Sequence, residues 1–122
     1  MNPAARYGTI QNETASRERL MVMLFETALR HIRNGAAEID AGRKREGAAL
    51  LVKATDIVAY LRRTLDHNVA PELCANLSSV YTFVCARLIK ASTTRTSKPA
   101  REAERAFVPL VDAFSQAVRV AA

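Results

Sequence analysis

Residues 16–42, SRERLMVMLFETALRHIRNGAAEIDAG, decide the fold that the sequence predicts. Apolar side chains recur in this stretch at spacings of about three and four residues, the period of one face of an α-helix. These residues are Leu20, Met23, Leu24, Leu29, Ile32, Ala36 and Ile39, with Met21, Phe25 and Ala28 widening the face. Ser16 can cap the start of such a helix, and Gly42 suits its end. The stretch therefore predicts an amphipathic helix of about six turns.

Three further segments show the same helical period. The second segment is expected to end near residues 65–68, and its apolar face holds Leu50, Leu51, Ala54, Ile57, Val58, Leu61 and Leu65. Pro71 favours the start of a third helix, because proline is accommodated in a first helical turn. The apolar face of that helix holds Leu73, Leu77, Val80, Tyr81, Val84 and Leu88. Residues 92–97 contain no apolar side chain and predict a loop, after which Pro99 opens a last helix. The face of the last helix holds Ala103, Phe107, Leu110, Val111, Phe114 and Val118.

The order of these segments predicts the fold class. Short connections force consecutive helices to run in opposite directions, so we expect an all-α protein, an antiparallel up-and-down four-helix bundle. Pro109 lies inside the last helix and cannot donate a hydrogen bond to the carbonyl of Arg105, so a kinked or broken last helix is expected. Residues 1–15 are short of periodic apolar residues and predict a flexible N-terminal arm before a bundle domain of residues 16–122.

Composition favours one intracellular domain. The chain has 122 residues, of which 49% are hydrophobic and 25% charged, so one core can form. Cys74 and Cys85 are about 16 Å apart along a straight helix, too far for a disulfide, and we expect both to be small buried residues. Unpaired thiols, no secretion signal and no apolar run that could span a bilayer favour a cytoplasmic location without stable membrane insertion.

The residues that could carry out catalysis or bind metal form no recognisable site. Zinc needs several converging ligands, but His31 and His67 lie in different predicted elements and the cysteines are far apart. No glycine-rich phosphate loop is present. A nucleophilic pair of a cysteine and a histidine is not excluded by sequence alone, although no local pattern supports it. We therefore expect no enzyme, no catalytic residue, no metal and no cofactor.

The formal net charge of +6 supports an alternative function, a basic helical nucleic-acid-binding module. Such a module concentrates Lys and Arg on one face. Here the basic residues occur in every predicted helix, often beside acids, as Arg17 and Arg19 are beside Glu18. A solvated helix surface accounts for that distribution, so we expect no nucleic-acid partner. A salt titration of binding to DNA separates the two interpretations.

Two blocks of sequence carry a pattern more specific than helical periodicity. The first is residues 14–26, TASRERLMVMLFE, and the second is Thr64-Leu65-Asp66 followed by residues 71–81, PELCANLSSVY. With this order and spacing, nearly the whole chain resembles the FliS family of flagellin-specific export chaperones. The positions that fit the family pattern are Ser16, Leu20, Met23, Leu24, Phe25, Leu65, Asp66, Glu72, Leu73, Asn76, Leu77 and Tyr81.

The resemblance implies a function as well as a helical bundle. It implies a cytoplasmic chaperone that binds the C-terminal segment of flagellin, prevents premature polymerisation and delivers flagellin to the flagellar export apparatus. The implied partners are therefore the flagellin C-terminal segment and a component of the export gate. Helix-in-groove recognition of an amphipathic segment requires an apolar groove, which amphipathic helices can supply.

The candidate binding residues lie mainly on the second and third predicted helices. Their apolar faces carry more large side chains than one narrow core seam uses, so some are expected to line the groove and others the core. These candidates are Ile57, Leu61, Leu65, Leu77, Val80, Tyr81 and Val84. The resemblance adds Tyr7, because family members use an N-terminal tyrosine to cover the groove and contact the gate. A permanently packed Tyr7 that only tethers the terminus is equally compatible with the sequence. For Asp66, a local contact with the backbone and a partner contact are both open.

Overall fold

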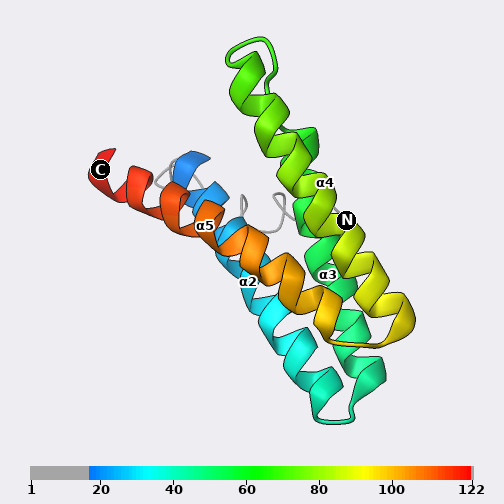
Figure 1. Cartoon of the computed structure of the whole chain (residues 1–122). Coiled ribbons are helices and arrows are strands. Elements are labelled where there is room, and N and C mark those ends of the chain that lie inside the picture. Colours follow the sequence, from blue (N-terminus) through cyan, green and yellow to red (C-terminus); the bar gives the residue numbers. More distant parts are fainter. Residues whose placement is uncertain (1–16, 122) are drawn as a thin grey trace.

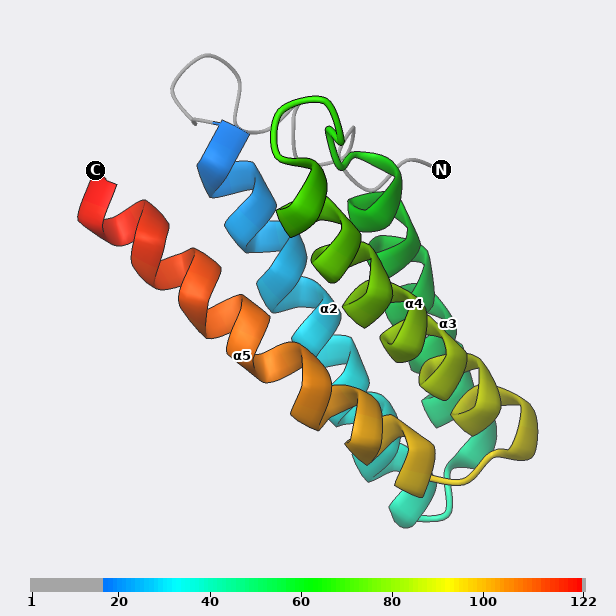
Figure 2. The ribbon, with the colours of Figure 1, turned by 45° about the horizontal axis from the view of Figure 1, so that its top comes forward.

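The computed structural model describes residues 17–121 and places them in an antiparallel bundle of helices (Figure 1). The helices are α2 (Arg17–Asp40), α3 (Lys44–Arg63), α4 (Pro71–Thr94) and α5 (Lys98–Ala121). They run alternately in opposite directions (Figure 2). Helix α2 packs on α3, α3 on α4, α4 on α5, and α5 again on α2, so the packing closes into a ring. The predicted all-α, up-and-down four-helix bundle is confirmed.

Some of the predictions fall outside the described residues. These are Tyr7, the cap at Ser16 and the arm of residues 1–15, so the boundary between arm and bundle stays a prediction. Within residues 17–121, no helix is long and apolar enough to cross a membrane. Cys74 and Cys85 are both buried and unpaired, as predicted.

The helix ends follow the local chemistry with one correction. Gly42 has a φ of 91°, a conformation that glycine adopts freely, and the chain turns there between α2 and α3. The prediction that residues 92–97 form a loop was wrong in its first half, because α4 continues to Thr94. Polar side chains do not end this helix because they bond back to it: the Thr94 hydroxyl donates to the carbonyl of Lys90 at 2.7 Å. The helix ends instead at Arg95, which adopts the left-handed conformation with a φ of 54°.

Pro109 does not interrupt α5. The helix runs without a break from Lys98 to Ala121, so of the two expected outcomes, a kink or a break, the break does not occur. Pro109 is exposed. The carbonyl of Arg105, which has no N–H of Pro109 to accept, can therefore be served by water. The second half of α5 thus stays helical.

Every helix contributes to one apolar core. Fully enclosed side chains include Leu24, Leu51, Val84, Leu88 and Phe107, each 0% exposed. An aromatic cluster is centred on Phe25 of α2. Its ring centroid lies 6.4 Å from that of Tyr81, 5.7 Å from that of Phe107 and 5.0 Å from that of Phe114. The cluster joins α2, α4 and α5 at spacings typical of stabilising aromatic pairs.

The two ends of the bundle differ. At the closed end, which we define as residues 38–46 and 90–105, the α2–α3 turn lies against the α4–α5 loop: Ser97 donates to Asp40 at 2.5 Å, and Arg101 pairs with Asp40 at 3.7 Å. At the open end, formed by the start of α2, the α3–α4 loop and the end of α5, the helices separate. Figures 1 and 2 show the C-terminal part of α5 diverging from the start of α4.

Candidate functional site

A groove opens between the diverging helices at the open end of the bundle. Its volume is about 380 Å³. All four helices contribute to it, together with the loop between α3 and α4. The lining residues are Met21, Phe25, Leu61, Thr64, Leu65, Asp66, Leu73, Leu77, Tyr81, Leu110, Ala113, Phe114 and Ala117. The lining is thus almost entirely apolar, as expected of a site that buries the hydrophobic face of a helix.

The residues that line the groove differ in how far they are exposed to solvent. Phe25 and Tyr81, 3% and 2% exposed, form the floor and belong to the aromatic cluster. Leu65 and Leu77 are half-buried and line the walls. Leu73 stands at the rim with 58% of its surface exposed, because the first turn of α4 extends beyond the neighbouring helices. A buried aromatic floor with partly exposed leucines above it leaves apolar surface for another molecule to cover.

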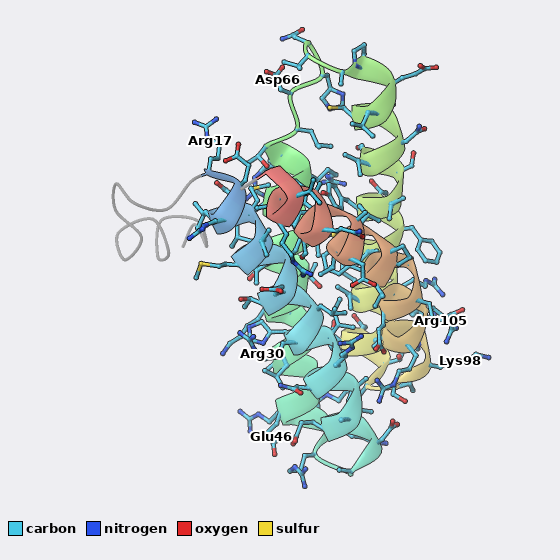
Figure 3. All side chains as sticks on the ribbon, turned by 90° about the vertical axis from the view of Figure 1, so that its left-hand side faces the viewer. Arg17, Arg30, Glu46, Asp66, Lys98 and Arg105 are labelled. Atoms are coloured by element: carbon cyan, nitrogen blue, oxygen red, sulfur yellow. The ribbon has the colours of Figure 1, made fainter. Side chains whose placement is uncertain are left out.

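Tyr81 and Asp66 are two of the polar residues that line the groove, and their surroundings differ. Burial raises the pKa of Tyr81 to about 12, with a smaller contribution from Cys74, so this phenol is neutral at physiological pH. Asp66 is the one charged residue among the described residues that line the groove. One of its carboxylate oxygens accepts the backbone N–H of Asn68 at 3.1 Å, which is the local backbone contact, one of the two roles that the sequence left open. Figure 3 places the Asp66 side chain at the tip of the bundle, near the α3–α4 loop.

The structure separates the predicted binding residues into three groups. Leu61, Leu65, Leu77 and Tyr81 line the groove. Ile57 and Val84 lie in the core, and Val80 packs partly buried against the core outside the groove lining. The position of Tyr7 lies outside the described residues. Of the seven candidates that the structure describes, four therefore line the groove, and no binding role is assigned by position alone.

The prediction of groove residues omitted α2 and α5. Met21, Phe25, Leu110 and Phe114 line the groove, and each belongs to an apolar face that the sequence displays. The missing information was which helices separate at the open end, since periodicity identifies the inner face but not the part left uncovered. Ala113 and Ala117 gave no sequence signal, because alanine is compatible with core, surface and groove alike.

A larger cleft of about 920 Å³ lies along α2 and α5 and has a different chemical character. Its lining is mostly polar or charged and comprises Glu26, Leu29, Arg30, Arg33, Asn34, Val111, Asp112, Ser115, Gln116 and Arg119. Charges of both signs line it, so it does not favour an apolar segment despite its size. Among the residues that the structure describes, no group of three or more His, Cys, Asp or Glu side chains could hold a metal ion. The apolar groove is therefore the better candidate site.

Comparisons with known proteins identify the relatives of this chain. The family model described as flagellar protein FliS matches residues 1–121. The flagellar secretion chaperone FliS of Bacillus subtilis is 31% identical over 97% of this chain and 87% of its own length. The flagellar secretion chaperone FliSB of Pseudomonas aeruginosa is 30% identical over 69% of this chain and 67% of its own length. The flagellar secretion chaperone FliS of Escherichia coli is 26% identical over 86% of this chain and 78% of its own length.

Proposed function

The chain belongs to the FliS family of flagellar proteins, and from that premise we propose that it is a cytoplasmic secretion chaperone whose groove binds the C-terminal segment of flagellin. It acts by binding rather than by catalysis and needs no cofactor. Its second partner is a component of the flagellar export gate, to which it delivers the bound flagellin. Covering the C-terminal segment prevents flagellin from polymerising before export.

The observation that carries this proposal is the apolar groove that residues 17–121 leave open. An amphipathic segment presents apolar side chains about every three or four residues along one face, and such a face suits a groove lined by leucine, methionine and aromatic side chains. Leu65 and Leu77 are only partly buried by the other described residues, so part of their apolar surface is left for a partner. Burying that surface against a segment that would otherwise self-associate stabilises both partners.

Co-expression with flagellin followed by size-exclusion chromatography tests the proposal. We expect the chain to co-elute with full-length flagellin and not with flagellin that lacks its C-terminal segment. A flagellin shortened by the same length at its N-terminus is the matched control and should still co-elute. Equal binding of both shortened flagellins would contradict the proposal.

Tyr7 remains a sequence-based proposal. We expect the N-terminal segment to occupy part of the groove in the free protein and to be displaced by flagellin, which must therefore bind more tightly than this segment. Replacing Tyr7 by Ala should leave the bundle folded, preserve or strengthen flagellin binding, and impair hand-over to the gate. Weaker flagellin binding together with intact export would indicate the opposite role.

A further inference from the structure

The positive charge of the protein is unevenly distributed along the bundle. The closed end, residues 38–46 and 90–105, holds eight Lys and Arg side chains against five Asp and Glu side chains. The open-end segments, residues 17–26, 60–73 and 108–121, hold five of each. In Figure 3, Lys98 and Arg105 project away from α5, far from Arg17 and Asp66 at the other end. The net charge is thus +3 at the closed end and zero at the open end, and the middle of the bundle carries the other +3 of residues 17–121.

Most acids of the closed end are already engaged. Arg43 pairs with Glu38 and lowers the pKa of that carboxyl. Arg33, at 2.8 Å, and Arg101, at 3.1 Å, both contact Glu104, and their hydrogen bonds outweigh its burial and lower its pKa. Asp40 accepts from Ser97 and pairs with Arg101. Glu102 pairs with Arg87 at 3.6 Å.

The remaining cations have no such partner. Six Lys and Arg side chains of the closed end are exposed and make no ion pair within residues 17–121. These are Lys44, Arg45, Lys90, Arg95, Lys98 and Arg105. Arg95 also stands in the left-handed conformation at the end of α4, a position that favours glycine. An arginine there keeps a charge at the tip of the bundle although local backbone preference disfavours it.

We propose that the closed end is a docking surface for the anionic phospholipid headgroups of a membrane. Unpaired Lys and Arg side chains gain free energy near an anionic bilayer without any apolar insertion. A specific protein interface normally adds aromatic or large apolar anchors, and residues 38–46 and 90–105 expose none. Binding of single-stranded nucleic acid uses aromatic stacking, for which these residues also offer no side chain. A diffuse anionic surface is the partner that this end fits best.

The position of this surface separates it from the groove. The six cations belong to residues 38–46 and 90–105, whereas the groove is lined by residues of the open end, so a polypeptide in the groove leaves the closed end free. Figure 1 shows these two ends at opposite sides of the bundle. Contact with a membrane surface would orient the bundle with its groove directed away from the bilayer. This inference does not depend on the identity of the molecule in the groove.

Co-sedimentation of the full chain with lipid vesicles tests the inference. The vesicles contain phosphatidylcholine with about one third phosphatidylglycerol, and neutral vesicles are made of phosphatidylcholine alone. We expect binding to the anionic vesicles at low salt, loss of binding at high salt, and no binding to neutral vesicles. No binding to anionic vesicles at low salt would overturn the proposal, and this measurement needs no variant.

Matched triple variants locate the surface. Lys44→Gln, Arg95→Asn and Lys98→Gln remove three charges from the closed end, with Asn chosen because it tolerates the left-handed conformation. Arg17→Gln, Arg62→Gln and Arg63→Gln remove the same net charge from the open end. We expect the first set to weaken vesicle binding by about fivefold per charge, on the order of 100-fold in all, and the second set far less.

Two outcomes of this comparison contradict the proposal. Equal weakening by both sets would show that net charge alone governs the attraction. Tighter binding to single-stranded DNA than to vesicles, lost with the closed-end set, would assign the surface to nucleic acid instead. Thermal unfolding followed by circular dichroism checks that both sets fold.

Discussion

Two leucines on the same helix show how exposure distinguishes a groove residue from a core residue. Leu77 and Leu88 are both part of the apolar face of α4. Leu88 is 0% exposed and enclosed by the core, whereas Leu77 is half-buried in the wall of the groove. The same side chain therefore contributes mainly to folding at one position, and at the other it offers surface to a partner.

Substituting each leucine by alanine separates these contributions. We expect Leu88→Ala to lower the free energy of unfolding by about 2–5 kcal/mol, because it leaves a cavity. Leu77→Ala should lower it by no more than about 1.5 kcal/mol, because less apolar surface is buried there. Affinity for flagellin should fall roughly tenfold for folded Leu77→Ala, the loss typical of an interface anchor. Urea denaturation and a binding titration measure both quantities, and equal loss of stability at both positions would place Leu77 in the core.

The burial of Tyr81 in the floor of the groove makes the free energy of unfolding depend on pH. Its pKa is raised from 10.0 to about 12 in the folded chain, chiefly by burial. The folded protein therefore keeps this proton at a pH where the unfolded chain releases it. The contribution of Tyr81 to the free energy of unfolding is fully present below pH 10 and is lost as the pH rises towards 12. The loss amounts to roughly 2–3 kcal/mol, at about 1.4 kcal/mol per pH unit.

The variant Tyr81→Phe tests this pH dependence. It keeps the ring of the aromatic cluster and removes the titrating hydroxyl. The difference in unfolding free energy between the two proteins should shift between pH 10 and 12 in favour of the variant. A constant difference over that range would show that the Tyr81 hydroxyl is not desolvated by folding.

At the scale of elements, α2 and α3 approach each other through two glycines. A Cβ atom added at Gly47 would lie 2.6 Å from the backbone oxygen of Gly35 and 2.6 Å from a side-chain carbon of Ile39. A Cβ atom added at Gly35 would lie 2.7 Å from the end of the Leu51 side chain, and 3.0 Å from the backbone oxygen of Gly47. A side-chain terminus can move more readily than backbone, so the two sites differ in tolerance.

We expect Gly47→Ala to be the more damaging of the two substitutions. Alanine should stabilise an isolated helix by about 1 kcal/mol, but here the methyl group forces α2 and α3 apart, and overpacking typically costs about 1–3 kcal/mol. Gly35→Ala should cost less, because its nearest contacts are side-chain atoms of Leu51 rather than backbone atoms. Thermal or urea unfolding of both variants measures the order, and a Gly47→Ala protein more stable than the parent would contradict the close approach.

The sequence predicted the elements better than their relative positions. The helical period located all the described helices, and Gly42 and Pro71 marked ends that the structure retains, because both signals depend on local backbone chemistry. The extent of α4 was missed, since Thr94 satisfies its hydroxyl on its own helix. The groove could be predicted only in part: periodicity selected Leu61, Leu65, Leu77 and Tyr81, but the divergence of α5 is a tertiary property that no local pattern encodes.

At the scale of the whole molecule, the bundle is divided into a cross-linked end and an opened end. Ion pairs and hydrogen bonds join α2 to α5 and to the α4–α5 loop at the closed end. At the other end, residues 17–121 leave apolar groove residues partly uncovered. Local stability should therefore decrease from the closed end towards the groove.

Hydrogen exchange measured by mass spectrometry tests this division. In the free protein we expect faster exchange in the second half of α5 and in the α3–α4 loop than in the segments at the closed end. Binding of flagellin should slow exchange at residues 110–121 and 64–73 and leave residues 38–46 unchanged. Uniform protection over the whole chain would indicate global stabilisation instead of a local site.

The ring of helix contacts has a topological consequence. Helices α2 and α5 are neighbours, and the start of α2 and the end of α5 lie at the same end of the bundle (Figure 2). The same packing of the helices is therefore compatible with a different order of connections between them. A circular permutant that joins the end of α5 to the start of α2 through a flexible linker, and is cut in the α4–α5 loop, retains every interhelical neighbour. Such a permutant should fold to the same bundle and would place a new, untethered terminus next to the basic end while closing the chain beside the groove.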